Sequence, residues 1–242
     1  MAQIKYPVEF IKRTDLFYSI DKKNTKDGDK SVLIPFLTEK EIDMAADKTT
    51  TDKAVAQHKE FEKLSKQSED YTQLRKNTFT PVFNNLNKEV QYLKSLYRGN
   101  PKELGNWGIT IDGTGTVVYP PSFEDKYDVF ILFYQKHKEM GDKSPLIPFL
   151  NENNINIDKD KTKADKADEL NNQKIVAELS SKEASNERDI LFEPIMEHIR
   201  GIGQFLKRLF PTNPRKIGDW GFNVVGKNNN GEEEEMKTPP KQ

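Results

Sequence analysis

The sequence predicts an all-α protein made of two tandem copies of one helical hairpin, packed into an elongated bundle with a small β element at the end of each copy. Two decapeptides, Gly28–Leu37 and Gly141–Leu150, differ only at Val32 and Pro145. Apolar residues also recur at steps of three, four and seven over long stretches, which is the spacing of one helix face. An internal repeat of this length has to be recognised before the fold is assigned.

The offset between the two decapeptides, from position 28 to position 141, holds along most of the chain without a gap. It aligns further motifs with one another: Pro81 with Pro194, Leu93-Lys94 with Leu206-Lys207, Asn100-Pro101 with Asn213-Pro214, and Gly105-x-Trp107-Gly108 with Gly218-x-Trp220-Gly221. We therefore divide the chain into repeat 1 (residues 1–119), a linker (120–122), repeat 2 (123–226) and a tail (227–242). The tail is predicted to be disordered because it is polar and lacks apolar side chains to bury.

The composition predicts lean cores and heavily solvated surfaces. Hydrophobic residues make up 34% and charged residues 32%, with a net charge of −1 and a mean hydropathy of −0.83. Such a balance excludes a strong global attraction for nucleic acid or for an anionic membrane. The chain has no cysteine, which excludes disulfides, thiolate metal sites and a cysteine nucleophile.

The N-terminal residues show no signal peptide, and no apolar run approaches the roughly 20 residues that span a bilayer. We expect a soluble protein and favour the cytoplasm, although a signal sequence removed before residue 1 would leave no trace.

Each repeat is predicted to begin with a helix, over about residues 7–23 in repeat 1 and 123–140 in repeat 2. Its apolar side chains fall on one face. We expect Gly28 and Gly141 to follow the helix ends, because glycine accepts the positive φ that terminates many helices.

The Leu-Ile-Pro-Phe-Leu segments that follow cannot form an interior turn of a helix, because Pro35 and Pro148 lack an amide donor. We expect their apolar side chains to cross and plug the end of the bundle. Thr38-x-x-Glu41 is typical of a capping box, with Asn151 at the matched position. Residues 40–52 and 153–165 are weakly patterned and are predicted to form a loose helical turn or a loop.

A long helix is predicted from about Thr51. In repeat 1 the pattern spans about six turns, and in repeat 2 a step of seven recurs, which is typical of antiparallel coiled-coil-like packing. The side chains concerned are Val55, His58, Phe61, Leu64, Ser68, Tyr71 and Leu74, and then Leu170, Ala177, Ala184 and Leu191. Pro81 and Pro194 interrupt both patterns, and we expect a kink or a tight break there with little change of direction.

Short alternating runs close each repeat, Ile109–Ile111 and Phe222–Val224, with a further strand candidate at Thr116–Tyr119. The strands that end the two repeats could pair with each other across the pseudo-symmetry, although two short strands alone are marginally stable.

The matched tryptophans, Trp107 and Trp220, allow two interpretations. Each indole is either a large apolar plug for the end of its bundle, which we favour, or a platform for a glycan or peptide ligand. Basic residues cluster near the end of each long helix, and the denser set in repeat 2 makes Arg215 and Lys216 candidates for binding an anion. Cations at a helix C-terminus also complement its dipole without any ligand. The two sets are Lys94, Arg98 and Lys102, and Lys207, Arg208, Arg215 and Lys216.

We find no catalytic constellation, no metal site and no cofactor motif in the sequence. None of His58, His137 and His198 is matched by a histidine in the other repeat, since Asn171 and Asn85 stand opposite the first and last. A duplicated metal or catalytic site would be expected to keep matched ligands, so we interpret these histidines as surface or boundary residues.

The sequence therefore favours a non-enzymatic structural, assembly or protein-interaction protein, with a helical surface for self-association or for a protein partner. The alternative is a ligand-binding module that uses the Trp-Gly ends to bind a glycan or a peptide.

Overall fold

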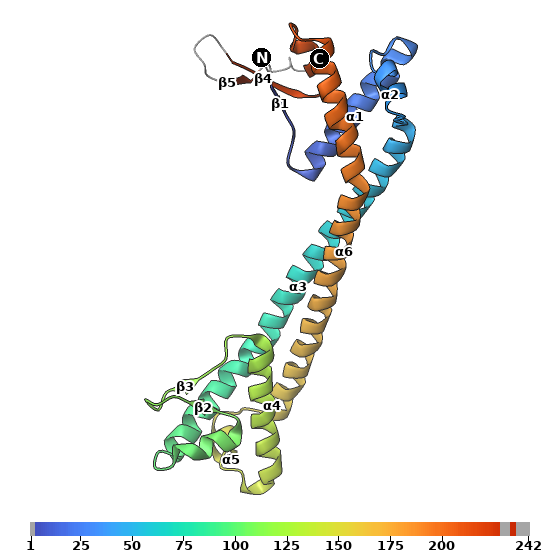
Figure 1. The fold of residues 1–242 in the computed structure, drawn as a ribbon. Helices are drawn as coiled ribbons and strands as arrows, with labels where there is room; N and C mark the ends of the chain where they lie inside the picture. Colours follow the sequence, from blue (N-terminus) through green and yellow to red (C-terminus); the bar gives the residue numbers. More distant parts are fainter. Residues whose placement is uncertain (1–2, 228–232, 236–242) are drawn as a thin grey trace. The chain divides into compact units, whose positions relative to one another are not determined.

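The computed structural model describes residues 3–227 and 233–235, and the protein is mainly α-helical, with long helices packed together (Figure 1). In chain order the elements are β1 (Gln3–Lys5), α1 (Phe10–Asp27), η1 (Gly28–Lys30), α2 (Ile34–Glu39), α3 (Met44–Leu96), η2 (Pro101–Trp107), β2 (Thr110–Ile111), β3 (Val117–Val118), α4 (Phe123–Met140), η3 (Gly141–Lys143), α5 (Ile147–Glu152), α6 (Ile157–Leu209), α7 (Arg215–Gly218), β4 (Asn223–Lys227) and β5 (Glu233–Glu235).

The helical elements that begin the chain recur at the spacing seen in the sequence. Helices α1 and α4 have 18 residues each, and α3 and α6 have 53 residues each. The starts and ends of α1, η1, α2 and α3 precede those of α4, η3, α5 and α6 by the same offset that separates Gly28 from Gly141. The two copies of the sequence motif thus sit in the same local structure.

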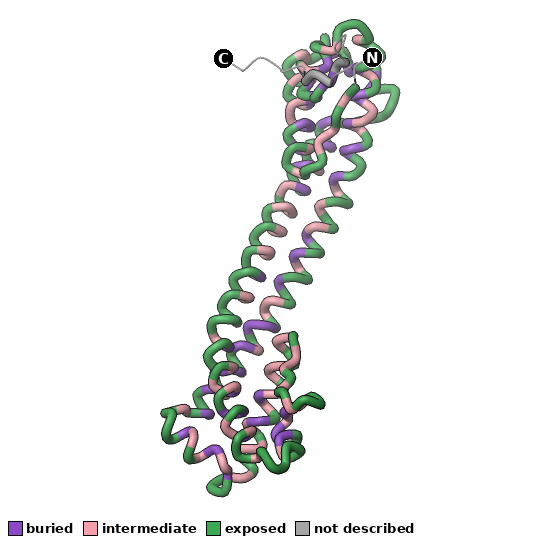
Figure 2. Tube along the Cα trace, turned by 90° about the vertical axis from the view of Figure 1, so that its left-hand side faces the viewer, coloured by how far each residue is buried: buried purple, intermediate pink, exposed green. Residues whose placement is uncertain are grey.

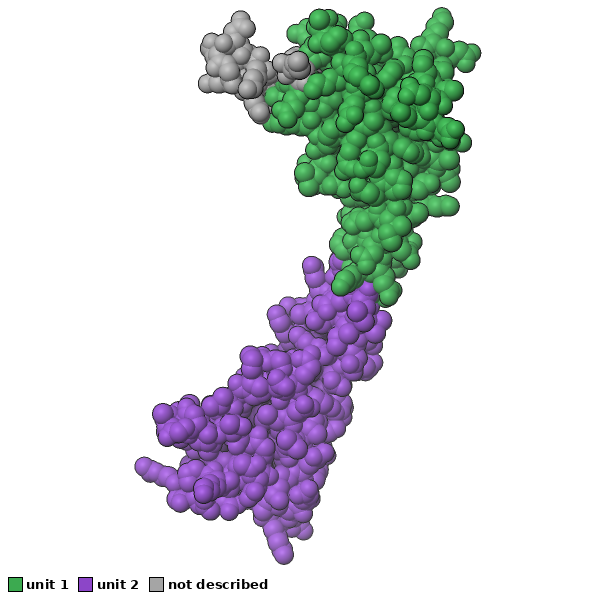
Figure 3. All heavy atoms as spheres, viewed as in Figure 1, with its two compact units in different colours: residues 1–63, 180–242 green, residues 64–179 purple. Residues whose placement is uncertain are grey.

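The chain forms two compact units, which do not coincide with the two sequence repeats (Figure 3). Unit 1 contains residues 1–63 and 180–242, and unit 2 contains residues 64–179. Each unit therefore joins the first half of one repeat to the second half of the other. The linker predicted between the repeats lies inside unit 2, where Ser122 caps α4 by accepting a hydrogen bond from the amide of Asp125 at 3.0 Å.

Each unit has its own apolar core, and buried positions recur along both long helices (Figure 2). In unit 1 the core joins Phe17 and Ile20 of α1 with Ile199 of α6 and with Trp220. The core of unit 2 is built from the matching segments, and it contains Leu86, Val90, Trp107, Phe130 and Phe133.

The two long helices run antiparallel to each other within each unit. In unit 1, Asp47 contacts His198 and His58 contacts Arg188. In unit 2 the contacts follow the same order, with Ser68 on Glu178, Arg75 on Asn171, and Asn85 on Asp160. The antiparallel direction is thus established, whereas coiled-coil packing of the side chains stays a prediction.

Both long helices begin before the predicted start at Thr51 and its match in repeat 2, at Met44 and Ile157, so the weakly patterned segments are largely helical. Asp43 caps α3, because its Oδ1 accepts from the amides of Ala45 and Ala46 at 2.9 and 3.1 Å. Asn156 accepts from the amide of Lys159 at 3.0 Å in the same way. The prediction that Thr38 and Asn151 cap the following helices was wrong, because both residues lie inside short helices, α2 and α5.

The Leu-Ile-Pro-Phe-Leu segments form these short helices. Pro35 and Pro148 occupy the first turn, where an amide has no partner in any case. Leu33 and Leu146 are fully buried in their cores, whereas Ile34 is 39% exposed. Gly28 and Gly141 follow α1 and α4 with φ of 51° and 53°, as expected.

Helices α3 and α6 continue through Pro81 and Pro194. Both prolines are exposed, and the carbonyl four residues earlier lies on the same helix face. Water can therefore satisfy the carbonyl that the missing amide leaves free, and each helix passes its proline without ending.

The strands that end the two repeats do not pair with each other. Strand β2 pairs with β3, with Thr110 opposite Val118. Strand β4 pairs with β1, with Gln3 opposite Val225, and with β5 on its other side. Of the predicted disordered tail, Lys227 ends β4 and 233–235 form β5; residues 228–232 and 236–242 lie outside the described part of the chain.

Candidate functional site

The two tryptophans lie in the cores of different units. Trp107 in unit 2 and Trp220 in unit 1 are each 2% exposed. The ring of Trp107 packs at 5.2 Å from that of Phe133, and Lys23 Nζ lies 5.6 Å from the centre of the Trp220 ring. Burial favours the interpretation as apolar plugs, because a ligand stacked on either indole would have to displace core side chains first.

The glycines after the tryptophans allow the first helix of the other repeat to approach the turn. Gly108 and Gly221 have φ of 73° and 91°, a region that side chains disfavour. A Cβ on Gly108 would lie 2.9 Å from Leu132 Cβ, and one on Gly221 would lie 2.7 Å from Ser19 Cβ. The repeated Trp-Gly dipeptide therefore has a packing reason in both units.

A polar groove of about 400 Å³ lies beside the Trp-Gly turn of unit 1. Lys5, Lys12, Asp15 and Ser19 contribute to its lining, together with Gly221. At the same offset, Lys5, Lys12 and Ser19 are matched by Val118, Asp125 and Leu132, and only Asp15 has an identical match, Asp128. Most of this lining is therefore not repeated in unit 2. Its charged groups of both signs can contact a polar ligand, although Lys12 also pairs with Glu9 at 2.8 Å.

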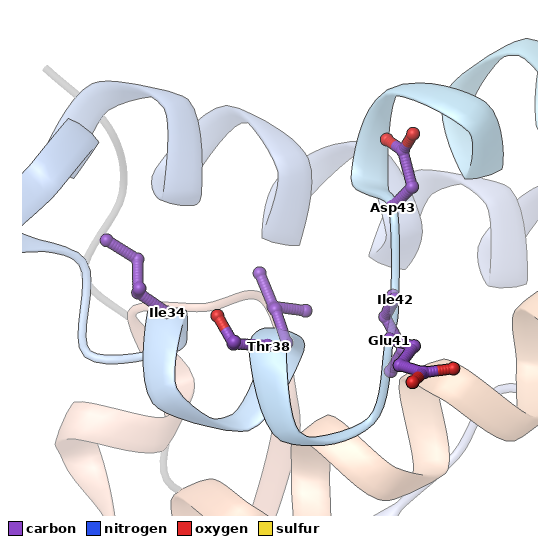
Figure 4. A pocket seen from close by; sticks show the side chains of 6 residues that line it. Ile34, Thr38, Glu41, Ile42 and Asp43 are labelled. Carbon is purple, nitrogen blue, oxygen red and sulfur yellow. The ribbon is translucent and has the colours of Figure 1, made fainter.

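A second groove, of about 360 Å³, lies between α2 and the start of α3 (Figure 4). Ile34 and Thr38 come from the short helix, whereas Glu41, Ile42 and Asp43 come from the segment that leads into α3. The Asp43 carboxylate is already engaged as the helix cap. These residues therefore provide no convergent acid and base.

The basic candidates Arg215 and Lys216 are exposed on the four-residue helix α7. Lys216 Nζ lies 5.2 Å from the centre of the Phe210 ring, a cation–π contact. Trp220 is buried while these two residues face solvent, so the structure does not assemble them into one binding surface with its ring.

An arginine that the sequence analysis did not select occupies matched positions in both units. The Arg188 guanidinium carbon lies 5.0 Å from the centre of the Phe10 ring, and its Nη1 lies 3.2 Å from His58 Nδ1. In unit 2, Arg75 lies 4.7 Å from the Phe123 ring and donates to Asn171 Oδ1. Each arginine thus ties α3 and α6 to the start of the shorter helix, α1 or α4, of its unit.

Each histidine has an asparagine at the matched position of the other repeat, and the two side chains make matching contacts in their units. His58 and Asn171 both contact the arginine, and His198 and Asn85 contact Asp47 and Asp160, each at 2.7 Å. The third pair is His137 on Ser144 at 2.7 Å and Asn24 on Ser31 at 2.5 Å. Burial lowers the pKa of His137. The contacts are structural, because an amide replaces the imidazole in the other unit.

Within the described residues, no group of three or more histidine or acidic side chains is placed to hold a metal ion. No helix in that same part of the chain has the length and apolarity needed to cross a bilayer.

No protein-family model, no curated protein and no solved structure matches this chain. The interpretation of the candidate sites therefore rests on their own geometry.

Proposed function

We propose that this protein is a non-enzymatic structural or assembly protein that presents a helical surface to a second copy of itself or to a partner protein. The proposal is carried by an apolar patch on α6 in unit 2, formed by Ile175, Val176 and Leu179, which are 40%, 63% and 59% exposed. Residues three and four apart are neighbours on a helix surface, so the three side chains form one patch. A contiguous apolar patch of this kind is typical of a contact surface.

The matched positions in repeat 1 are Glu62, Lys63 and Lys66. A helix with the same bounds therefore forms with polar side chains at these places, so the fold does not require the patch. We also propose that the chain arose by tandem duplication, on the support of the matched helix bounds, and that the two copies then diverged at this surface.

Replacing Val176 and Leu179 by lysine, the residues that repeat 1 has there, is expected to weaken association at least tenfold. Burying one such side chain contributes about 1.5–3 kcal/mol, and about 1.4 kcal/mol corresponds to a factor of ten. Light scattering with chemical crosslinking measures self-association, and quantitative pull-down from the source measures partner binding.

The matched control is Leu96→Lys, because Leu96 is 51% exposed near the other end of the same helix pair in unit 2. It is expected to leave association unchanged. Two results would refute the proposal: a wild-type chain that stays monomeric and captures nothing, or a double variant that associates as strongly as the wild type.

A second candidate function is binding of a glycan or peptide at the Trp-Gly end of unit 1, favoured by the polar groove beside Gly221. If it is correct, titration with a panel of oligosaccharides and peptides should shift the tryptophan emission. Ser19→Leu, the residue at the matched position 132, narrows the groove and should abolish the shift, while Asp128→Asn, at the matched surface of unit 2, leaves it intact. A panel without any shift would contradict this function.

A further inference from the structure

Unit 2 contains a carboxyl group that the fold leaves without any partner. Glu89 of α3 is 1% exposed, and neither of its carboxyl oxygens forms a hydrogen bond. Its helix neighbours Leu86 and Val90 are fully buried in the unit 2 core. An isolated carboxylate in such surroundings is strongly disfavoured relative to water, and a buried acid responds by keeping its proton.

The charges around Glu89 favour the protonated acid as well. The charge of Asp160 of α6 acts on Glu89 in this direction. Asp160 is held by Asn85 Nδ2 at 2.7 Å and by Lys163 Nζ at 3.8 Å, whereas no donor reaches the carboxyl oxygens of Glu89.

The other elements of the unit 2 core offer no compensating cation. Helix α4 contributes aromatic rings, and its His137 is hydrogen-bonded to Ser144. Helix α5, η2 and the segment before α5 contribute apolar side chains, and no described lysine, arginine or histidine pairs with Glu89. These core side chains are Phe130 and Phe133 of α4, Leu150 of α5, Leu104 and Trp107 of η2, and Leu146 just before α5. Burial, followed by the charge of Asp160, raises the pKa of Glu89 to about 8.

Unit 1 has no such acid at the matched place. The residue of repeat 2 that matches Glu89 is Ile202, which is 1% exposed in the core of unit 1. Asp47, at the position that matches Asp160, contacts His198 at 2.7 Å. The core of unit 1 therefore packs with an isoleucine at this position, so the packing does not require the acid that unit 2 has there.

We infer that folded unit 2 binds a proton at Glu89 and releases it when the unit opens, so that raising the pH from mildly acidic to mildly alkaline destabilises unit 2 through a group that unit 1 lacks. This protonation goes beyond the proposed function of presenting a helical surface, because it makes the stability of one unit depend on pH.

The direction of the pH effect on stability follows from the pKa of Glu89 in the unfolded chain and in the folded unit. The ordinary pKa of the carboxyl is 4.5, and the folded value is about 8. Between these values the folded unit keeps a proton that the unfolded chain has lost. The free energy of unfolding therefore falls as the pH rises through this window, and the contribution of Glu89 becomes constant above about pH 8. Below pH 4.5 Glu89 is neutral in both states and has no influence.

The experiment compares urea unfolding of the full chain at several pH values, with the emission of Trp107 as the readout in a Trp220→Phe background. Trp107 lies in unit 2, so it reports that unit. The test variants are Glu89→Gln, which keeps the shape without the charge, and Glu89→Ile, which copies repeat 2. Between about pH 5.5 and 7.5 the ratio of the unfolding constant of the parent to that of either variant should rise about tenfold per pH unit.

A ratio that does not change with pH for either variant would overturn the inference. So would a stabilisation by magnesium or calcium chloride at about pH 8 that EDTA reverses and Glu89→Gln abolishes, because Glu89 would then bind a cation in place of a proton. Use of both variants guards against one of them failing to fold.

Discussion

Replacing Trp220 by alanine is expected to lower the free energy of unfolding by about 3–5 kcal/mol, the usual cost of truncating a buried large aromatic side chain. Trp220 is 2% exposed and packs in the core of unit 1 with Leu16 and Phe17 of α1. The indole therefore links the end of repeat 2 to the first helix of repeat 1. Urea unfolding followed by circular dichroism measures the loss.

Trp220→Phe is the matched control and is expected to cost much less, because it keeps most of the apolar surface. Substituting Arg215, an exposed residue on α7, by alanine should change stability by less than about 0.5 kcal/mol. If Trp220→Ala were as stable as the parent protein, the plug interpretation would be wrong and the indole would be free to serve a ligand.

Cutting the chain in the β2–β3 turn is expected to leave the two fragments firmly associated. Thr114 is exposed in that turn, so a protease site inserted after it can be cleaved in the folded protein. The first fragment supplies residues up to 63 to unit 1 and residues 64–114 to unit 2, and the second supplies the remainder of both. Since each core needs side chains from both fragments, the cut chain should elute as one species of the original mass.

The uncut protein with the same insertion serves as the control for any effect of the added residues. Denaturant should separate the cut fragments, and its removal should restore the complex. Elution of two separate folded fragments under native conditions would mean that each repeat folds by itself, and the assignment of residues to the two units would then be incorrect.

Local pattern explains what the sequence predicted well and where it failed. The three-four spacing identified the helices, but their starts at Met44 and Ile157 were missed. Residues 44–51 are largely polar, and only the fold shows that Met44, Asp47 and Thr51 are 8%, 8% and 0% exposed. A polar residue buried by tertiary contact does not contribute to an apolar pattern.

The matched arginines show that more of the candidate sites was within reach of the sequence. Arg75 and Arg188 are separated by the same offset as the two decapeptides, so a comparison of all charged residues between the repeats would have selected them. The isolated acid Glu89 was also visible as a mismatch with Ile202. Its burial without a partner was not visible, because that depends on which side chains of α4 and α6 surround it.

The sequence by itself determined that near-identical decapeptides recur at one offset and that the chain is mainly helical, because these features depend on composition and on spacing along one segment. Tertiary structure alone decided that each unit combines halves of both repeats. The spacing of apolar residues predicts which face of each helix is buried, but it does not say which repeat supplies the partner face. This combination follows from the continuity of α3 and α6 through Pro81 and Pro194. The second half of an unbroken long helix cannot turn back to pack on the shorter helix of its own repeat.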